Sequence, residues 1–324
     1  MLSEFSLISR YFDRPPRPGS RAALGIGDDC ALLRPAAGMH TAISSDMLVE
    51  GRHFFAGADP RLLGHKCLAV NLSDLAAMGA QPVGFTLALA LPAADEAWLS
   101  AFSEGLFTLA DRHSCELIGG DTTCGPLTIC ITIFGDVPAG QALRRDGAQA
   151  GDDIWVSGSL GDARLALAGY RHEIALDAAD LAAASMRMHA PEPRVALGLA
   201  LRGIAHAAID ISDGLAGDLA HILERSAVGA TVDVDALPAG AALVGQPQAV
   251  RRNYTLAGGD DYELCFTAPH GLRTDVQAVA GRLGIALARI GTIDAATGLR
   301  LVDSMGAPLS LHVQSFDHFT TPAP

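Results

Sequence analysis

The sequence predicts two domains of the mixed α/β class, with an α+β or α/β fold in each half. The chain has 324 residues, enough for two ordinary domains that each have a core. Strand-like and helix-like stretches alternate along its length. A polar, turn-rich stretch at 147–152 precedes the first strand candidate of the second half. We therefore expect an N-terminal domain at 1–140 and a C-terminal domain at 141–324.

The first half contains a short helix candidate, a proline-rich turn and two long helices. The short helix is expected at 3–12, before the turn at 15–19. A helix at 60–78 starts at a proline, which suits an early helical position, and stops at a glycine. The helix expected at 95–113 has one apolar face, formed at three-to-four spacing by Trp98, Phe102, Leu106 and Leu109. Strand candidates are 31–33, 40–43, 84–90, 116–118 and 127–134.

The second half continues the alternation. Strands are expected at 153–157, 207–211, 230–234, 262–267 and 286–290. Helices are expected at 161–168, 192–202, 214–226 and 273–283. The pattern leaves the order of the strands in the sheet open.

Charge and hydropathy exclude several classes of protein. The net charge is −13 and no basic stripe is present, which argues against a nucleic-acid partner. The longest apolar run, 83–91, is much shorter than a membrane-spanning helix, and the N-terminus does not resemble a signal peptide. We therefore expect a cytoplasmic protein without a membrane partner. The six cysteines form no C-x-x-C pair, so buried reduced thiols are expected rather than structural zinc or disulfides.

Aspartates recur directly after apolar, strand-like stretches that end in small residues. This pattern precedes Asp28-Asp29, Asp46, Asp121, Asp210 and Asp260-Asp261, and Asp74 lies within the first long helix, three residues after Asn71. Glycine or serine before an aspartate allows the backbone to approach a phosphate closely. Magnesium prefers oxygen ligands and usually bridges carboxylates and substrate phosphates. Helix capping and ordinary turn chemistry explain any one of these motifs alone, but their repetition favours a shared metal site.

Other nucleotide-binding signatures are absent. The sequence contains no Walker A motif, no Rossmann-type G-x-G-x-x-G and no His-Arg-Asp kinase set. No segment matches the twelve-residue calcium loop. If ATP is the co-substrate, its phosphates are held in another way.

Taken together, eight segments resemble the thiamine-monophosphate kinase family in order and spacing. They are GIGDDCALL (25–33), SSDMLVEGRHF (44–54), NLSDLAAMGAQP (71–82), GGDTT (119–123), RRDGAQAGD (144–152), VSGSLGD (156–162), DISDGL (210–215) and GGDDYELCFT (258–267). That family is similar to the aminoimidazole ribonucleotide synthetase and selenophosphate synthetase superfamily. The resemblance implies an N-terminal α+β domain that contributes to a dimeric β-barrel, a C-terminal α/β domain and a homodimer.

The resemblance also implies a reaction. It is the ATP-dependent phosphorylation of thiamine monophosphate to thiamine diphosphate, the last step of thiamine diphosphate biosynthesis, by direct transfer with several Mg²⁺ ions. The acceptor phosphate is already an anionic nucleophile, so no general base is required. The protein's task is to align two phosphate groups and offset their charge.

Site roles follow from the resemblance by motif position. The implied metal ligands are Asp29, Ser44, Ser45, Asp46, Asp74, Asp121, Asp210 and Asp213. The implied ATP contacts are Gly120, Asp121, Arg145 and Ser212, and the implied substrate contacts are His53, Asp260 and Phe316. The residues expected to support the transfer most directly are Asp46, Asp74, Asp121 and Arg145, with Arg144 the more solvated arginine.

Some residue roles have alternatives. Asp28 competes with Asp29, since neighbouring residues on a strand point to opposite faces. At the position of Asp260 the resemblance leads us to expect glutamate in many members, and the shorter side chain changes its reach. His53 is a substrate-positioning group or a surface histidine, and Phe316 stacks on the substrate or packs in the core.

Other functions are also considered. A sister synthetase of the superfamily is the nearest alternative, although a selenophosphate synthetase needs a reactive residue near its N-terminus and no cysteine precedes Cys30. A non-catalytic nucleotide- or metal-binding protein and an acidic interaction protein are the others.

Overall fold

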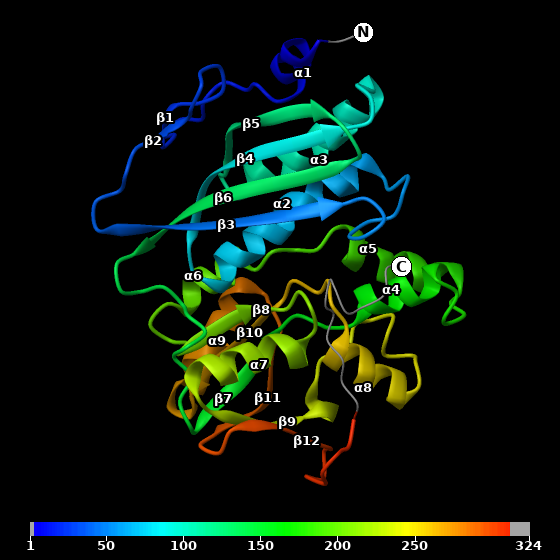
Figure 1. Ribbon diagram of the computed structural model, residues 1–324. Coiled ribbons are helices and arrows are strands. Elements are labelled where there is room, and N and C mark those ends of the chain that lie inside the picture. The colour runs from blue at the N-terminus through cyan, green and yellow to red at the C-terminus, as the bar shows by residue number, and fades with distance from the viewer. Residues whose placement is uncertain (1–2, 312–324) are drawn as a thin grey trace. The chain divides into compact units, whose positions relative to one another are not determined.

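The computed structural model describes residues 3–311 (Figure 1). This part of the chain divides into two compact units, one made of residues 3–75 and 80–140 and the other of residues 76–79 and 141–311. Each unit combines helices with a β-sheet, so the predicted mixed α/β class is confirmed. The division of roles between the two halves of the chain stays a prediction.

A four-stranded sheet forms the centre of the first unit. Its order is β3 (Met39–Val49), β6 (Thr128–Pro138), β4 (Gln81–Leu91) and β5 (Glu116–Cys124). Strand β6 is antiparallel to both of its neighbours, whereas β4 and β5 are parallel. Helices α2 (Pro60–Ala77) and α3 (Glu96–Arg112) lie on one face of this sheet (Figure 1). Ile129, Ile131 and Ile133 alternate along β6 and are at most 1% exposed, so they form the core beneath the helices.

Helix α3 confirms the periodicity read from the sequence. Asp95 accepts hydrogen bonds from the backbone N–H groups of Ala97 and Trp98, so the helix begins at the next residue. Phe102, Leu106 and Leu109 are fully buried, and the ring of Trp98 stacks on that of Phe102 at 4.8 Å between centroids. The apolar stripe is therefore the packing face of the helix.

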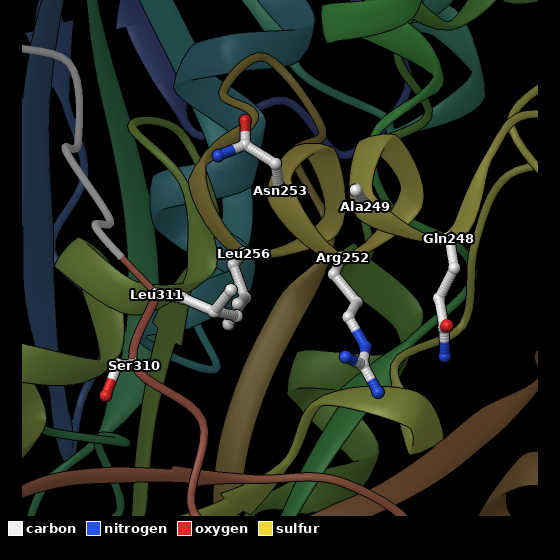
Figure 2. Close-up of a pocket in the computed structure, with 7 residues that line it drawn as sticks. All are labelled: Gln248, Ala249, Arg252, Asn253, Leu256, Ser310 and Leu311. Atoms are coloured by element: carbon white, nitrogen blue, oxygen red, sulfur yellow. The ribbon is translucent and has the colours of Figure 1, made fainter.

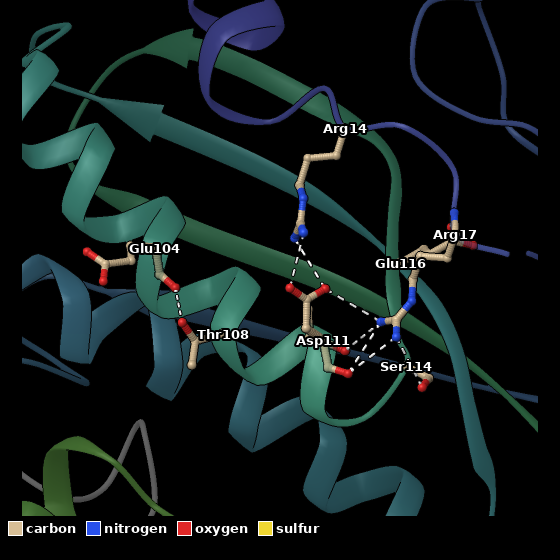
Figure 3. A network of polar contacts seen from close by, with 8 residues as sticks. Arg14, Arg17, Glu104, Thr108, Asp111, Ser114 and Glu116 are labelled. Carbon is tan, nitrogen blue, oxygen red and sulfur yellow. Dashed lines mark hydrogen bonds and ion pairs between the residues drawn. The ribbon is translucent and has the colours of Figure 1, made fainter.

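The N-terminal segment is attached to the end of α3. It contains α1 (Glu4–Tyr11), begun by the Ser3 cap, and a ribbon of β1 (Ala22–Leu24) and β2 (Leu32–Leu33). Directly before the proline-rich turn, both terminal nitrogens of Arg14 donate to the Asp111 carboxylate at 3.3 and 3.1 Å (Figure 3). Arg17 donates to the backbone oxygen of Asp111 at 3.4 Å. These arginines fix the predicted turn against the last turn of α3.

The second unit has a six-stranded sheet. Its order is β12 (Gly298–Val302), β9 (Gly229–Asp233), β11 (Leu287–Asp294), β7 (Asp152–Ser157), β10 (Leu264–Pro269) and β8 (Ala207–Asp210). Only the β9–β12 pair is parallel. The helices of this unit are α4 (Asp162–Tyr170), α5 (Ala178–His189), α6 (Val195–Leu201), α7 (Leu215–Ser226), α8 (Gln248–Ala257) and α9 (Arg273–Leu283). Its core joins β7, β8 and β11 to α7 through Val156, Ile209, Ile290 and Leu219.

Two α-helices and two strands of the described residues were missing from the expectations: α5, α8, β1 and β12. Helix α5 is rich in alanine and buries only Ala184, Ser185 and Met188, so few large apolar side chains mark its packing face. Helix α8 mixes polar and apolar residues and buries Tyr254, Thr255 and Leu256. The apolar residues before Gly258-Gly259, interpreted as the end of a strand, are in fact the end of α8. Short apolar runs do not distinguish the two kinds of element.

Two predicted strands are longer than expected, which changes the position of their aspartates. Strand β3 was expected to end at residue 43, yet it pairs with β6 without interruption from Met39 to Val49. Strand β5 was expected to end at residue 118, yet it continues to Cys124. Asp46 and Asp121 therefore lie within strands and not after them, because backbone pairing with a neighbour tolerates polar side chains on an edge strand.

Candidate active site

In the first unit, β3 and α2 bring three of the predicted metal ligands together. The Ser44 hydroxyl donates a hydrogen bond to Asp74 Oδ2. One turn earlier on α2, Asn71 Oδ1 accepts the backbone N–H of Asp46 at 3.2 Å. Asn71 is fully buried, and its amide donates to the backbone oxygen of Cys67 at 2.9 Å, which fixes its orientation. Ser44 and Asp46 are two residues apart on one strand, so both side chains lie on the face that α2 covers.

Ser45 lies on the other face of the same sheet. Its hydroxyl contacts Thr132 Oγ1 at 3.0 Å and donates to the backbone oxygen of Ile131 at 3.2 Å. The alternation of the strand separates it from Ser44 and Asp46. The structure thus divides the Ser-Ser-Asp motif between two faces.

Asp121 is also separated from Asp46 and Asp74. Asp121 is opposite Ala88, Ala88 is opposite Cys130, and Cys130 is opposite Met47. Directly paired residues share a face, so Asp121 lies on the face of Met47 and Ser45. The row that contains Asp46 ends instead at Gly120, about 14 Å away across three strand spacings. The first unit therefore does not place Asp46, Asp74 and Asp121 on one face of the sheet. The sequence had led us to expect that these aspartates share one site.

Gly120 is required by the close approach of β4 and β5. Its φ is 151°, and a Cβ at this position would lie 1.9 Å from the backbone oxygen of Leu87. A shift in register between β4 and β5 occurs nearby, at Phe85 and Thr86. The close strand packing thus explains why position 120 is a glycine. Its contact with ATP stays a prediction.

Asp28 and Asp29 lie in a turn after β1, and both are exposed. The backbone N–H of Asp29 donates to Asp28 Oδ1 at 2.8 Å. Because neither residue is on a strand, the expectation that they point to opposite faces of a strand is wrong. The carboxylate of Asp28 is engaged with its own turn, which favours Asp29 as the ligand.

His53 follows β3 and has a defined tautomer. Its Nδ1 accepts the backbone N–H of Val49 at 2.9 Å. An accepting Nδ1 carries no hydrogen, so the neutral ring has its proton on Nε2. The ring is half-buried, and its proposed substrate contact would use a donor.

In the second unit, two loops bring four predicted residues together. Asp210 is the last residue of β8 and is opposite Leu264 of β10. Beyond these strands the pairing continues: the backbone N–H of Asp260 donates to Ser212 O and that of Tyr262 to Ile211 O, both at 2.8 Å. Asp210, Ser212, Asp213 and Asp260 therefore belong to one loop cluster.

Asp218 is a residue of this cluster that sequence reasoning missed. It is 4% exposed, and its Oδ2 accepts the backbone N–H groups of Ser212 at 3.1 Å and Asp213 at 3.2 Å. Burial, and then the charges of Asp210 and Asp213, raise its pKa to about 8. The available signal was an acidic residue in the first turn of a helix whose packing face is apolar.

Arg144 and Arg145 are both exposed and differ in their ion pairs, and the expectation that Arg144 is the more solvated stays a prediction. Arg144 Nε donates to Asp146 Oδ1 at 2.8 Å in an exposed ion pair, which raises the pKa of Arg144. Arg145 is also exposed, but its guanidinium takes part in none of the ion pairs found within residues 3–311. Its backbone oxygen accepts the Ser226 hydroxyl at 2.9 Å. The guanidinium of Arg145 is therefore suited to bind an anion.

The donor set fits a hard cation such as Mg²⁺. Carboxylate and hydroxyl oxygens gather at Ser44, Asp46 and Asp74, and three carboxylates gather around the loop of Ser212. Within residues 3–311, no three side chains of His, Cys, Asp or Glu form a ready metal cluster. Magnesium usually takes one or two carboxylates and completes its shell with water and substrate phosphate, so these groups remain compatible with it.

The second unit also has a pocket of about 280 Å³ that none of the predicted site residues within 3–311 lines (Figure 2). It is lined by Gln248, Ala249, Arg252, Asn253, Leu256, Ser310 and Leu311. None of these is a predicted site residue. Arg252 is engaged with Asp235 through hydrogen bonds of 2.8 and 2.6 Å. Phe316, the remaining predicted residue, lies outside the described residues.

Comparisons with known proteins agree with these motifs. Residues 27–137 match the family described as AIR synthase related protein, N-terminal domain, and residues 149–304 match the corresponding C-terminal domain. The thiamine-monophosphate kinase of Salmonella typhimurium strain LT2 is 48% identical, over 98% of this chain and 99% of that protein.

Solved structures are similar as well. The thiamine-monophosphate kinase of Stenotrophomonas maltophilia K279a is 49% identical with a TM-score of 0.83, over 89% of this chain and 92% of that one. The complex of AaThiL with AMPPCP and TMP is 27% identical with a TM-score of 0.76, over 88% of this chain and 89% of that one. From the full-length identity, the two matching domains and the shared fold, the chain belongs to the thiamine-monophosphate kinase family.

Proposed function

We propose that this chain transfers the γ-phosphoryl group of ATP to thiamine monophosphate, which gives thiamine diphosphate and ADP and completes thiamine diphosphate biosynthesis. The observation that carries the proposal is 48% identity to a thiamine-monophosphate kinase over 98% of the chain. The similar fold of AaThiL in complex with AMPPCP and TMP supports the same two substrates.

The residues of the first unit are proposed to bind cations beside the transferred phosphoryl group. When bound, Mg²⁺ offsets the negative charge that develops between donor and acceptor phosphates. Ser44, Asp46 and Asp74 would hold it on the face covered by α2, while Ser45, Asp121 and Asp29 would supply further oxygen ligands. The hydrogen bonds that the Asp46 backbone N–H donates to Asn71 and the Ser44 hydroxyl donates to Asp74 fix these groups before substrate arrives.

The remaining predicted residues are proposed to bind the two substrates and further cations. Asp210 and Asp213 would bind metal, and Ser212 would contact ATP. Gly120 and Arg145 would hold the phosphates of ATP, the latter with its forked guanidinium. His53, Asp260 and Phe316 would orient thiamine monophosphate. No residue is assigned as a general base, because the acceptor oxygen is already anionic.

A homodimer is proposed through the sheet face of the first unit that α2 and α3 leave uncovered. Met39, Ile43 and Met47 of β3 are 43%, 63% and 55% exposed and alternate along that face. A second copy of this chain is the partner that would bury them, and Ser45 and Asp121 share this face. An Ile43→Asp variant should sediment as a monomer if the wild-type protein is a dimer formed there. An unchanged dimer would exclude this face.

The proposed location is the cytoplasm. Among the described residues, no helix combines the length and apolarity needed to cross a membrane. Fractionation of cells that express the protein would test the location directly.

The decisive experiment measures thiamine diphosphate formed from thiamine monophosphate, ATP and Mg²⁺. Wild-type protein should form product, Asp46→Asn should form almost none, and Asp111→Asn should resemble wild type because it removes a carboxylate that is bound to Arg14 instead. Chelation with EDTA should stop the reaction and added Mg²⁺ should restore it. Absence of product from wild type with bound ATP would overturn the substrate and favour a sister synthetase.

A further inference from the structure

The turn that follows α8 has an unusual backbone. Asp260 and Tyr262 have φ values of 65° and 51°, in the left-handed region that few residues other than glycine adopt. Asp261 and Glu263 are 2% and 0% exposed, whereas Asp260 and Tyr262 are only half-buried. Alternate residues of this turn are therefore buried, and strain of this kind persists only where the surroundings enforce it.

Asp261 is the first buried anchor of the turn. Its two carboxylate oxygens accept the backbone N–H of Gly161 at 2.9 and 3.1 Å. Gly161 precedes α4 and itself has a φ of 87°, so the turn is fixed to the start of that helix. Burial raises the pKa of Asp261 well above its usual value.

Glu263 is the second buried anchor. Its carboxylate accepts hydrogen bonds from the Ser157 hydroxyl at 2.6 Å, from Arg187 at 2.7 Å and from Arg194 at 2.6 and 2.5 Å. A fully buried carboxylate with three partners has a single orientation. The turn is thereby fixed at both ends of its buried side.

The backbone of the turn is held against the loop of Ser212. Besides the bonds from Asp260 N–H and Tyr262 N–H described above, a Cβ at Gly259 would lie 2.5 Å from Ser212 O. Such a close approach leaves little freedom to the residue that follows. The main chain of Asp260 is thus defined relative to Ser212 and Asp213.

The side-chain rotation of Asp260 is restrained by Tyr262. The Tyr262 hydroxyl donates to Asp260 Oδ1 at 3.1 Å. Since Asp260 stands where the family resemblance implies a longer glutamate in many members, its orientation decides which groups it reaches.

We propose that Tyr262 is a positioning residue, whose hydroxyl holds the Asp260 carboxylate in the orientation that recognises the cationic thiamine moiety of the acceptor. The proposal rests on the proposed function. A carboxylate that a phenol hydroxyl already holds in place loses little rotational freedom when it binds a cation or accepts an N–H group. Binding is therefore stronger than with a freely rotating carboxylate.

The test compares Tyr262→Phe, Asp260→Asn and the double variant with wild type in steady-state kinetics. Tyr262→Phe keeps the ring and should raise the KM for thiamine monophosphate about tenfold, while kcat and the KM for ATP stay within about twofold. The KM of the double variant for thiamine monophosphate should be no higher than the higher KM of the two single variants, because both substitutions remove the same interaction. Tyr170→Phe is the matched control, since it removes a hydroxyl that contacts His189 Nε2 at 3.3 Å in the same unit.

Either of two results would overturn the inference: an unchanged KM for thiamine monophosphate in Tyr262→Phe, or additive losses in the double variant. A purely structural role for the hydroxyl would lower thermal stability and kcat without the selective change in KM. Failure of the proposed function is distinguishable, because wild-type protein would then form no thiamine diphosphate at all.

Discussion

The Ser44 hydroxyl donates a hydrogen bond to Asp74 Oδ2 and so joins an edge strand to the helix that covers it. A second bond, from the backbone of Asp46 to Asn71, lies one helical turn away. Strand β3 and helix α2 are thus fixed to each other at the point where the predicted metal ligands gather. If these residues are metal ligands as proposed, such polar contacts would orient their oxygen atoms.

Substitution of Ser44 and substitution of Asp74 should both lower kcat/KM, but by different factors. Ser44→Ala leaves both carboxylates but removes the donor that orients Asp74, so kcat/KM should fall about tenfold. Asp74→Asn removes a proposed ligand and should lower kcat/KM at least about a hundredfold. Rate measurements over a range of Mg²⁺ concentrations should show a raised requirement for Mg²⁺ in both variants. Wild-type activity in Asp74→Asn would remove this group from the proposed site.

Asp218 should stabilise the loop of Ser212 and Asp213 through its acceptor oxygen. Asp218→Ala leaves two backbone N–H groups without their acceptor, which should cost about 2 kcal/mol of unfolding free energy. Asp218→Asn retains an acceptor and also relieves repulsion with Asp210 and Asp213, so it should lose less. Thermal denaturation without ligands compares the two variants. Equal melting temperatures for the alanine and asparagine variants would contradict this role.

Glu263 should be a major determinant of the stability of the second unit. Removing it by Glu263→Ala leaves Arg187 and Arg194 near a buried site without their shared partner, and about 3–5 kcal/mol should be lost. Glu173→Ala is a suitable comparison, because its pair with Arg164 is 38% exposed at the carboxylate and should contribute about 1 kcal/mol or less. Urea titration of both variants provides the measurement. Similar midpoints for the two variants would show that the buried network is not stabilising.

Acid should weaken the contact between Asp235 and Arg252. The hydrogen bonds from the Arg252 guanidinium lower the pKa of Asp235 to about 2, below its value in the unfolded chain. The stabilisation is therefore complete above about pH 4 and is lost as the pH falls towards 2, with a magnitude on the order of 1 kcal/mol after solvent screening.

An Asp235→Asn variant provides the comparison for this pH dependence. Its deficit in unfolding free energy relative to wild type should be constant above pH 5 and shrink as the pH approaches 3. Urea denaturation across this range measures the difference. A deficit that grows on acidification would have the wrong sign.

Several parts of the fold could be predicted because their causes are local. The bounds of α2 and α3 follow from Pro60, from the Asp95 cap and from an apolar stripe at helical spacing. By contrast, the apolar residues before Gly258-Gly259 were interpreted as the end of a strand, and they are the end of α8, where Tyr254, Thr255 and Leu256 are buried. A short apolar run does not by itself distinguish the end of a helix from the end of a strand.

The sequence by itself determined the family and the residues of its motifs. The order and spacing of the aspartate motifs identify the family, because each motif is contiguous in the chain. The tertiary structure alone decided which of them meet. It places Ser44 and Asp46 on one face of the sheet and Ser45 and Asp121 on the other. It also brings Asp218 and Tyr262 to residues the sequence had already singled out. The physical reason is that strand register and loop pairing depend on hydrogen bonds between residues far apart in the chain, which a local pattern does not encode.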